Sequence, residues 1–466
     1  MLAAGMNTRQ KLAAATMNRD LRTICILRLL SVLLLLTLPA LVRAQFAYTT
    51  NNGTITITGY TGSGGAVTIP EATNGLPVTS IANGAFKYRT GLTSVSIPDS
   101  VTSIGDMAFY FCTGLTNLTI GNSVSSIGAW AFESCNMTSI TIPSGVTSIG
   151  IEAFGYCTNL TSVTIPDTVT SIGASGFQAC TALASLAIGN GVSSIEDDVF
   201  AYCYSLLSVT IPNSVISIGV QAFYCCYSMT NITIPNSVIS IGDDACWLCT
   251  NLTSLTIGNG VTSIGQAAFN ACLGLTNVTI GDNVTGIGDW AFVSCFSLKS
   301  LIIPNSVNSI GDDAFAHCYS LSSVTIGNGV ASIGDYAFEA CSNLTAVYFQ
   351  GNATSISSNV FLGDNYLAVY YLPGTTGWPP FFSNRPTSLW LPQVQTSHPI
   401  FGVQTNQFGF NINWASGMTV VIEASTNLAS LTWYPLETLT LASGSPYFSD
   451  FEWTKYPTRF YRLRWP

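Results

Sequence analysis

Cysteine is the residue whose spacing in this 466-residue chain most invites chemistry. Eleven of the fourteen cysteines share one position of a repeating pattern. Thiols at such spacing can form disulfides or bind zinc. Arg89 and Asp364 take this position in the first and last repeats, where we expect less burial. The eleven cysteines are Cys112, Cys135, Cys157, Cys180, Cys203, Cys226, Cys249, Cys272, Cys295, Cys318 and Cys341.

Packing explains these cysteines better than bridging or metal binding does. Equivalent positions in stacked repeats point their Cβ atoms in parallel, whereas a disulfide needs converging vectors. Cys246 and Cys249 form a C-x-x-C, and Cys225-Cys226 precedes it by one repeat, which leaves zinc as an alternative. However, Cys246 only replaces the phenylalanine of its repeat. We therefore predict buried, free thiols and no metal or other cofactor.

Paired acids recur as Asp197-Asp198, Asp243-Asp244 and Asp312-Asp313. The first acid of each pair stands where a short helical turn is expected to begin, so capping of that turn is the favoured role. Neighbouring repeats lack the pair, which excludes a continuous calcium ladder and leaves weak calcium binding as the minor alternative.

Reactive side chains for catalysis are in short supply. The only histidines are His317 and His398, which lie in different segments, and the repeats around His317 offer no matching nucleophile or carboxylate. No glycine-rich phosphate loop precedes a helix. We predict that the protein is not an enzyme and has no catalytic residues.

Aromatic side chains gather at one corner of the repeats near the middle of the chain. Exposed aromatic groups supply a large contact area at low entropic cost and often mark a binding surface. The alternative is that they cover the edge of the coils and seal the thiols beneath them. We predict a candidate partner-binding surface made of Tyr202, Tyr204, Tyr224, Tyr227 and Trp247.

A 23-residue repeat must position all of these side chains. The tripeptide Ser-Ile-Gly, or a close variant, returns at this interval, and only the step from Ile127 to Ile149 is one residue shorter. A fixed period of this length is typical of a solenoid, in which each unit buries its apolar face against its neighbours. The isoleucines are Ile81, Ile104, Ile127, Ile149, Ile172, Ile195, Ile218, Ile241, Ile264, Ile287, Ile310, Ile333 and Ile356.

Residues 321–341 illustrate what one repeat is expected to form. Apolar residues alternate with Ser and Thr over 321–326 as in a short strand, and Gly327-Asn328-Gly329 is turn chemistry. A second short extended piece follows. Asp335 then stands as a helix N-cap, and Ala337-Phe338 begin a short helical turn that closes the coil. Stacked copies would pair their strands at about 4.8 Å.

The first 44 residues are expected to be a signal peptide, whether translation begins at Met1 or at Met17. Basic residues precede an apolar run, and Val42-Arg43-Ala44 is a small-x-small pattern that predicts cleavage before Gln45. Beyond Ala44 the chain carries 8 basic and 22 acidic groups, a net charge of −14. So few cations argue against nucleic acid and anionic membranes as partners. No later apolar run is long enough to span a membrane.

From Val67 to Phe361 the repeats resemble the BspA-like leucine-rich-repeat family of bacterial surface and secreted proteins. The shared units combine L-x-x-L-x-L, S-V-x-S-I-G and A-F-x-x-C. The resemblance implies a β-rich leucine-rich-repeat solenoid with short strands and short helical turns in each coil, and a protein-binding or adhesive surface. Gly59–Pro70 resembles the first coil of such a stack and Tyr370–Trp378 its closing strand, so we assign residues 45–391 to the solenoid with its end caps.

A second domain is expected at residues 399–466, after a linker at 392–398. Four segments there alternate as short strands do, which suggests a small β-sandwich. Val421–Leu428 and Arg459–Leu463 resemble a fibronectin-III-like module of secreted Verrucomicrobia proteins. Five of the eight basic residues beyond Ala44 lie near this end, so a secretion, anchoring or spacer role is open. The four segments are 408–414, 418–423, 436–441 and 458–463.

These features favour a secreted or cell-surface repeat protein that mediates protein–protein recognition or adhesion. A carbohydrate-binding adhesin, which would use the same aromatic side chains to stack on sugars, is the first alternative. The second is a structural envelope component that self-assembles. A protein partner is therefore expected first, and a glycan second.

Overall fold

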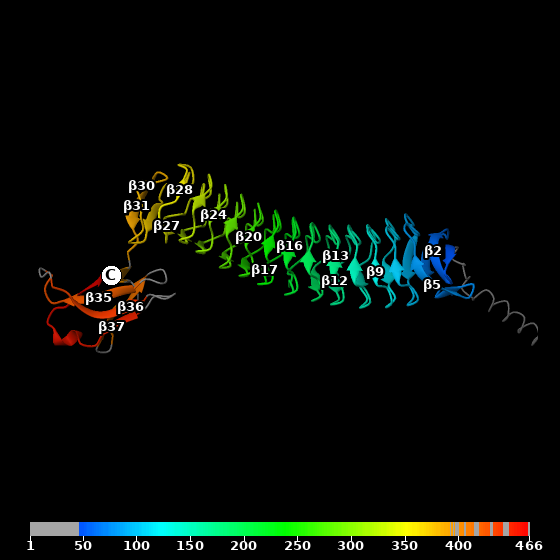
Figure 1. The fold of residues 1–466 in the computed structure, drawn as a ribbon, viewed down its shortest axis with the longest axis horizontal. Helices are drawn as coiled ribbons and strands as arrows, with labels where there is room; N and C mark the ends of the chain where they lie inside the picture. The colour runs from blue at the N-terminus through cyan, green and yellow to red at the C-terminus, as the bar shows by residue number, and fades with distance from the viewer. Residues whose placement is uncertain are drawn as a thin grey trace, which may run out of the picture. The chain divides into compact units, whose positions relative to one another are not determined.

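The computed structural model describes residues 46–391, 393–394, 396, 400–404, 407–413, 419–428, 432–440 and 447–464. The predicted signal peptide at residues 1–44 and His398 lie outside these residues. The chain forms a β-solenoid of about 14 turns with almost no helix, followed by small antiparallel sheets (Figure 1), which confirms the predicted fold class. Two units make up the chain, residues 1–215 with 222–227, and residues 216–221 with 228–466.

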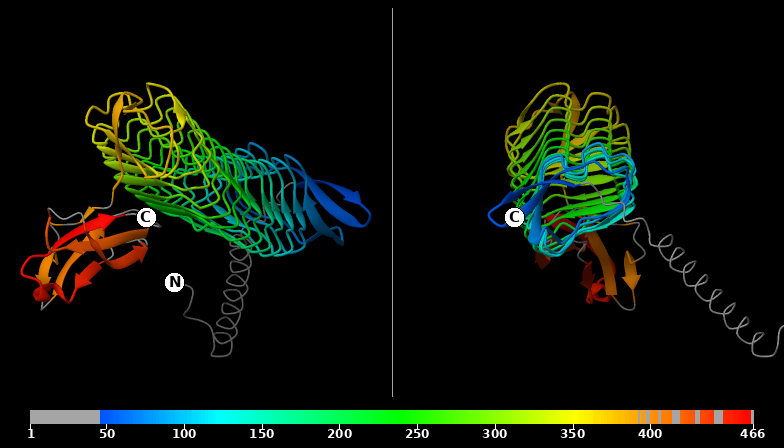
Figure 2. Two further views of the ribbon diagram at one scale, coloured as in Figure 1. Left: turned by 60° about the vertical axis from the view of Figure 1, so that its left-hand side comes forward. Right: turned by 90° about the vertical axis from the view of Figure 1, so that its right-hand side faces the viewer.

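Most coils of the first unit contribute two short strands, and Figure 2 shows the coils stacked one on another. One sheet has the order β1-β2-β5-β7-β9-β11-β13, and two three-stranded sheets have the orders β3-β6-β8 and β10-β12-β14. Equivalent residues pair directly, since Ser148 faces Ser171 and Ile149 faces Ile172. The strands are β1 (Phe46–Asn51), β2 (Thr54–Tyr60), β3 (Gly65–Thr68), β4 (Ala72–Thr73), β5 (Leu76–Ile81), β6 (Leu92–Ser96), β7 (Ser103–Ile104), β8 (Asn117–Thr119), β9 (Ser126–Ile127), β10 (Ser139–Thr141), β11 (Ser148–Ile149), β12 (Ser162–Ile165), β13 (Ser171–Ile172), β14 (Ser185–Ile188) and β15 (Ser194–Ile195).

The second unit continues with the same pattern. Its parallel strands run in the orders β16-β18-β20-β22-β24-β26-β28, β17-β19-β21 and β23-β25-β27-β29-β31, and β30 pairs antiparallel with β31. The strands are β16 (Ser217–Ile218), β17 (Asn231–Ile234), β18 (Ser240–Ile241), β19 (Ser254–Ile257), β20 (Ser263–Ile264), β21 (Asn277–Thr279), β22 (Gly286–Ile287), β23 (Ser300–Ile303), β24 (Ser309–Ile310), β25 (Ser323–Ile326), β26 (Ser332–Ile333), β27 (Ala346–Phe349), β28 (Ser355–Ile356), β29 (Ala368–Tyr371), β30 (Phe381–Phe382) and β31 (Arg385–Leu389).

The corner after each Ser-Ile-Gly consists of β-turns, so the predicted helical turn is wrong. Met107 and Phe111, the third residues of two such turns, have left-handed φ angles of 54° and 57°, which a right-handed helix does not contain. Their N–H groups bond to carbonyl groups of the next coil, at 2.7 Å for Met107 and 2.9 Å for Phe111. At the corner, backbone N–H groups such as those of Met107 and Phe111 form hydrogen bonds with the next coil. They are therefore not available for the hydrogen bonds within one segment that a helix requires.

Stacked phenylalanine rings fill the core beneath this corner. In the first unit, the rings from Phe86 to Phe223 lie with centroids 4.6 to 5.8 Å apart. In the second unit the rings from Phe269 to Phe361 lie 5.2 to 5.8 Å apart. These distances are close to the strand spacing of about 4.8 Å, so one ring per coil fills the interior.

Both ends of the solenoid carry extra strands. At the start, β1 and β2 form a hairpin that turns at Asn52 and Gly53, whose φ angles of 48° and 78° suit a primed turn. At the end, Trp378 stacks on Tyr371 at 5.0 Å. Asp364 in the last coil is fully buried, contrary to our expectation, and its carboxylate interacts with Arg385 at the start of β31. 

The remaining strands form two small antiparallel sheets. One contains β32, β33, β34 and β37, and the other has the order β36-β35-β38. Side chains from both sheets, including Phe410, Ile422 and Phe448, pack in one core. Their bounds are β32 (Gln393–Val394), β33 (Gly402–Gln404), β34 (Gln407–Asn413), β35 (Thr419–Ser425), β36 (Tyr434–Thr440), β37 (Tyr447–Asp450) and β38 (Phe460–Arg464), with the short helix η1 at Trp453–Lys455.

Candidate partner-binding surface

The corner turns place the predicted aromatic side chains. Tyr202 is the third residue of the second turn in its coil and has a left-handed φ of 62°. Its N–H donates to the carbonyl of Tyr224 in the next coil at 2.7 Å. Tyr204 and Tyr227 follow the buried cysteine of each coil. The repeat therefore stacks like positions above one another, and tyrosines on adjacent coils meet.

Four of the five predicted residues form one cluster of rings, which we call the tyrosine cluster. The rings of Tyr204 and Tyr227 stack with centroids 5.1 Å apart and planes 13° apart. The ring of Tyr202 contacts Tyr224 edge-on at 5.1 Å and Tyr204 at 6.3 Å. Tyr204 and Tyr227 are exposed, whereas Tyr202 and Tyr224 are half-buried. The fifth residue, Trp247, is half-buried in the second unit.

Two tyrosine hydroxyls of the cluster are held neutral over a wide pH range. A hydrogen bond with Cys225, together with burial, raises the pKa of Tyr227 to about 12. Burial also raises the pKa of Tyr202, and the neighbouring Cys225 and Asp198 add to this rise. The cluster therefore presents uncharged hydroxyl groups and ring edges at neutral pH.

Further aromatic side chains occupy the same corner and were missed by the sequence prediction. Tyr88, Phe111 and Tyr156 are exposed at the position of Tyr202. The ammonium group of Lys87 lies 5.1 Å from the ring centre of Tyr88 and also covers Tyr110. The signal was present in the sequence, because Tyr88 and Phe111 are 23 residues apart and Phe111 and Tyr156 are 45 apart, two repeats that include the 22-residue step. Phe296 and Tyr319 of the second unit, which the sequence already indicates as aromatic residues of this corner, stack at 4.9 Å.

The paired acids support the backbone between coils, so helix capping is the wrong role. Oδ1 of Asp243 accepts the N–H of Gln266, at 2.7 Å, and Oδ1 of Asp312 accepts the N–H of Asp335, also at 2.7 Å. The second acid of a pair is used as well, since Oδ2 of Asp313 accepts the indole N–H of Trp290. Carboxylates at these positions bind the neighbouring coil, because there is no helix to cap.

The repeated cysteines are buried and free, as predicted. Thiols of the repeats donate to backbone carbonyls of the preceding coil, as Cys112 does to Phe86 at 3.1 Å and Cys157 to Phe132 at 3.2 Å. Burial raises the pKa values of Cys112, Cys157 and Cys203 to about 12. Such thiols are protonated at neutral pH and are poor nucleophiles and metal ligands. In the described part of the chain, no three His, Cys, Asp or Glu side chains are arranged to hold a metal ion.

His317 is placed at the corner beside Tyr319, with ring centroids 6.0 Å apart. Its Nδ1 atom is buried and has no hydrogen-bond partner among the described residues. The carboxylate of Asp313 interacts electrostatically with His317, but among the described residues no hydrogen bond joins Nδ1 of His317 to an acid or a nucleophile. This arrangement offers no catalytic set at His317.

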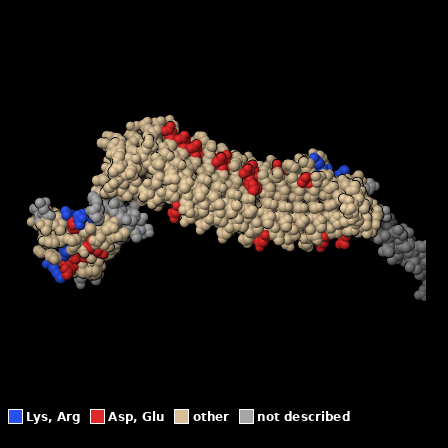
Figure 3. All heavy atoms as spheres, viewed as in Figure 1, with Lys and Arg blue, Asp and Glu red and all other residues tan. Residues whose placement is uncertain are grey.

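Charge is sparse on the solenoid and is neutralised in the terminal sheets. On the face in Figure 3, acidic side chains lie along the edges of the coils. In the terminal sheets, Glu423 binds both Arg462 and Arg464 at 2.7 Å, and Asp450 binds Arg459 at 3.1 Å. Arg459, Arg462 and Arg464 therefore form ion pairs with acidic residues of the same terminal sheets. Among the described residues, no helix has the length and apolar character needed to cross a bilayer.

Known proteins share the repeat pattern. The family model for the BspA type leucine rich repeat region matches residues 79–206, 170–296 and 240–368. A leucine-rich repeat protein from Bacteroides ovatus is 29% identical, over 66% of this chain and 92% of that chain, with a TM-score of 0.45. A leucine rich cell surface protein from Faecalibacterium prausnitzii is 31% identical, over 70% of this chain and 93% of that chain, with a TM-score of 0.43. No curated protein matches the sequence.

Proposed function

Because the chain belongs to the BspA-type leucine-rich-repeat family, we propose that it is a secreted or cell-surface protein that recognises a protein partner without catalysing a reaction. The apolar run before Ala44 supports export. Leucine-rich repeats generally bind proteins. The proposed binding surface is the tyrosine cluster.

The observation that carries this proposal is the contiguity of the tyrosine cluster. Four rings on two adjacent coils contact one another, so their side chains are already ordered before a partner binds. Preordered aromatic groups lose little entropy on binding, and tyrosine is enriched among residues that dominate interface energies. Tyr204 and Tyr227 cover one face of each other's ring, so each ring keeps at most one face for stacking on a sugar, whereas ring edges and hydroxyls can also contact a protein. For this reason we place a protein partner before a glycan.

An affinity capture tests the proposal. Purified residues 45–466 serve as bait for extracellular proteins and for a glycan array, beside the double variant Tyr204→Ala/Tyr227→Ala. Loss of two central aromatic contacts should weaken capture of a protein partner by about thirtyfold, which corresponds to roughly 2 kcal/mol. The control is Tyr366→Ala, which removes the exposed ring of a tyrosine outside the cluster.

The outcomes separate the candidate functions. Protein capture that the double variant loses and the control keeps supports the proposal. Glycan binding that both Tyr224→Ala and Trp247→Ala abolish would replace it with the carbohydrate-binding adhesin. Retention of nothing except further copies of the bait would favour the structural envelope component.

We also propose that residues 399–466 are a fibronectin-III-like module that acts as a spacer. Two antiparallel sheets around one core support this assignment. The ion pairs of Arg459, Arg462 and Arg464 leave little free positive charge for attachment to an anionic surface. Deleting the module should leave cell-surface retention unchanged, and loss of retention would identify it as an anchor instead.

A further inference from the structure

Glu196 stands at a position that glycine fills in the neighbouring coils. The sequence reads Ser194-Ile195-Glu196 where other coils have Ser-Ile-Gly. A Cβ atom on Gly128, Gly150 or Gly173 would lie 2.5 to 2.6 Å from a backbone nitrogen of the preceding coil. Real Cβ atoms do not approach that closely, so the coil that carries Glu196 must stand away from its neighbour.

The stack opens at this coil. The first sheet ends at β13 and does not include β15. The N–H of Ser193 lies 3.4 Å from the carbonyl oxygen of Thr170, whereas the equivalent bond from Thr170 to Thr147 measures 2.9 Å. The N–H of Gly173 donates a hydrogen bond to the carbonyl oxygen of Ile149. Among the described residues, no equivalent bond joins the N–H of Glu196 to the carbonyl oxygen of Ile172.

The corner of the same coil stays closed. The N–H of Ser175 still bonds to the carbonyl of Asp197 at 2.8 Å, and that of Ala179 to Ala201 at 2.8 Å. The two coils are thus joined at the corner and through β12 and β14, which pair in register, and they part only between β13 and β15. A wedge of this shape leaves space beside the glycine positions.

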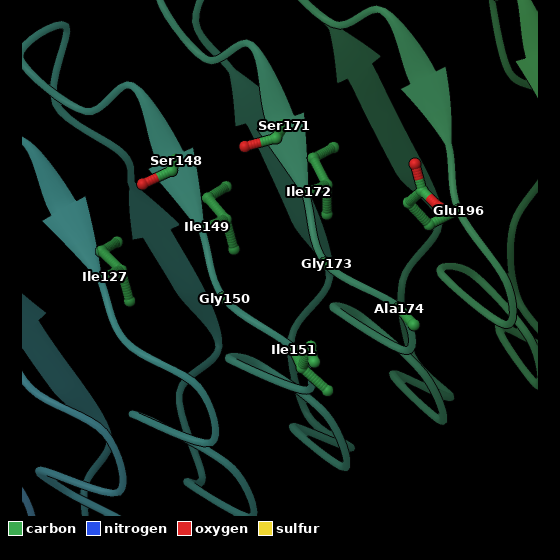
Figure 4. Close-up of a pocket in the computed structure, with 10 residues that line it drawn as sticks. All are labelled: Ile127, Ser148, Ile149, Gly150, Ile151, Ser171, Ile172, Gly173, Ala174 and Glu196. Atoms are coloured by element: carbon green, nitrogen blue, oxygen red, sulfur yellow. The ribbon is translucent and has the colours of Figure 1, made fainter.

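A hollow of about 540 Å³ lies at this opening. Figure 4 shows its walls, which come from Ser-Ile-Gly segments of adjacent coils. The apolar side of the hollow is the exposed side chain of Ile151, behind which Ile149 and Ile172 are buried, and the Glu196 carboxylate lies beside Ile172. The hydroxyl of Ser194 donates a hydrogen bond to Oε1 of Glu196, which fixes the side chain along the strand.

The charged side chains in and next to the hollow are acidic. Asp197 and Asp198 follow Glu196 directly, and no lysine or arginine occurs between Arg89 and Lys299. Burial raises the pKa of Asp198, and the charges of Asp197 and Glu152 add to that rise. Such repulsion between carboxylates indicates a negative potential that no lysine or arginine of this part of the chain neutralises.

We infer that the hollow at Glu196 is a docking site for a basic side chain, lysine or arginine, of a protein partner. Such a side chain has an aliphatic stem that suits the exposed Ile151 side chain and a cationic end that pairs with the Glu196 carboxylate. Charge complementarity selects this occupant over an acidic or a purely apolar one. The inference is independent of the tyrosine cluster and can fail without affecting the proposed function.

The test uses n-butylammonium as a mimic of the lysine side chain and n-butanol as its neutral counterpart. Residues 45–466 with labelled isoleucine δ1-methyl groups are titrated by NMR. We expect saturable shifts at Ile149, Ile151 and Ile172 with the ammonium and weak, unsaturated shifts with the alcohol. Glu196→Gln, which retains the hollow and removes the charge, should weaken the ammonium affinity about tenfold.

Two further variants complete the design. Glu196→Gly restores the glycine position, should close β13 onto β15 and should abolish the saturable shifts. Glu71→Gln removes an exposed acid elsewhere and should leave them unchanged. Three outcomes would each overturn the inference. The first is that Glu196→Gln and the parent chain bind n-butylammonium with equal affinity, and the second is that n-butanol binds as well as n-butylammonium. The third is that isoleucines throughout the solenoid shift to a similar extent.

Discussion

Asp364 shows how one residue alters the energetics of a coil. It takes the place of cysteine in the last repeat and is fully buried, and neither carboxyl oxygen has a hydrogen-bond partner among the described residues. Burial raises the pKa of Asp364 to about 8, and the charge of Arg385 only partly opposes this. The folded chain therefore favours the protonated carboxyl, while the unfolded chain ionises near the ordinary pKa of 3.8.

The sign of the resulting pH dependence follows from this difference. Since the folded pKa is above the unfolded one, the free energy of unfolding falls as pH rises from about 4 to about 8. The neutral variant Asp364→Asn should lose this slope and be more stable than the parent at pH 8 by about 1–3 kcal/mol. Urea unfolding at pH 5 and pH 8 measures the effect, with the exposed Glu437→Gln as control. Parallel pH profiles for parent and Asp364→Asn would contradict it.

At the scale of the element, glycine sets how closely two coils approach. The Ser-Ile-Gly glycines do not need an unusual φ angle. They are required because a side chain there would strike the backbone of the preceding coil. Glu196 supports this explanation, because β13 and β15 do not pair at the coil where glutamate replaces the glycine.

A matched pair of substitutions tests this requirement. In Gly128→Ala the new Cβ would lie 2.6 Å from the backbone nitrogen of Asp106, whereas in Gly155→Ala the nearest atom is 3.4 Å away. Gly128→Ala should lower the free energy of unfolding by about 1–3 kcal/mol because the coils must separate. Gly155→Ala should be neutral or slightly stabilising. Similar urea midpoints for the two variants would refute the close-approach explanation.

The strands could be predicted from sequence, but the corner could not. Alternation of apolar and hydroxyl residues defines β25, and the spacing of Ile149 and Ile172 gives their register. Ala-Phe-x-x-Cys has the composition of a helical turn, and residues such as Met107 and Phe111 carry no sign of a left-handed backbone. That conformation depends on hydrogen bonds to the next coil. The same holds for the opening at Glu196, which depends on a distance between coils.

The tyrosine cluster was predictable for a simpler reason. Residues one repeat apart lie on adjacent coils, so Tyr202 must lie near the equivalents of the next repeat. What spacing does not provide is ring orientation, and the face-to-face contact of Tyr204 with Tyr227 emerged only from the structure.

At the scale of the whole molecule, the thirteen cysteines beyond Ala44 are all buried and free. Exclusion of water should make these thiols unreactive while the chain is folded. We expect no maleimide adducts at pH 7.5 in native buffer and thirteen per chain in denaturant, counted by mass spectrometry. A native adduct, or fewer than thirteen after denaturation without reductant, would show an exposed thiol or a disulfide.

In-register pairing also has a genetic consequence. Ser148 meets Ser171 and Ile149 meets Ile172, so each coil offers its successor the same partners that it received. A duplication or deletion of one 23-residue unit by recombination would leave no mismatched junction within a stack. The 22-residue step from Ile127 to Ile149 keeps this pairing as well. Copy number is therefore free to drift between lineages, and the length of the displayed surface can evolve separately from its fold.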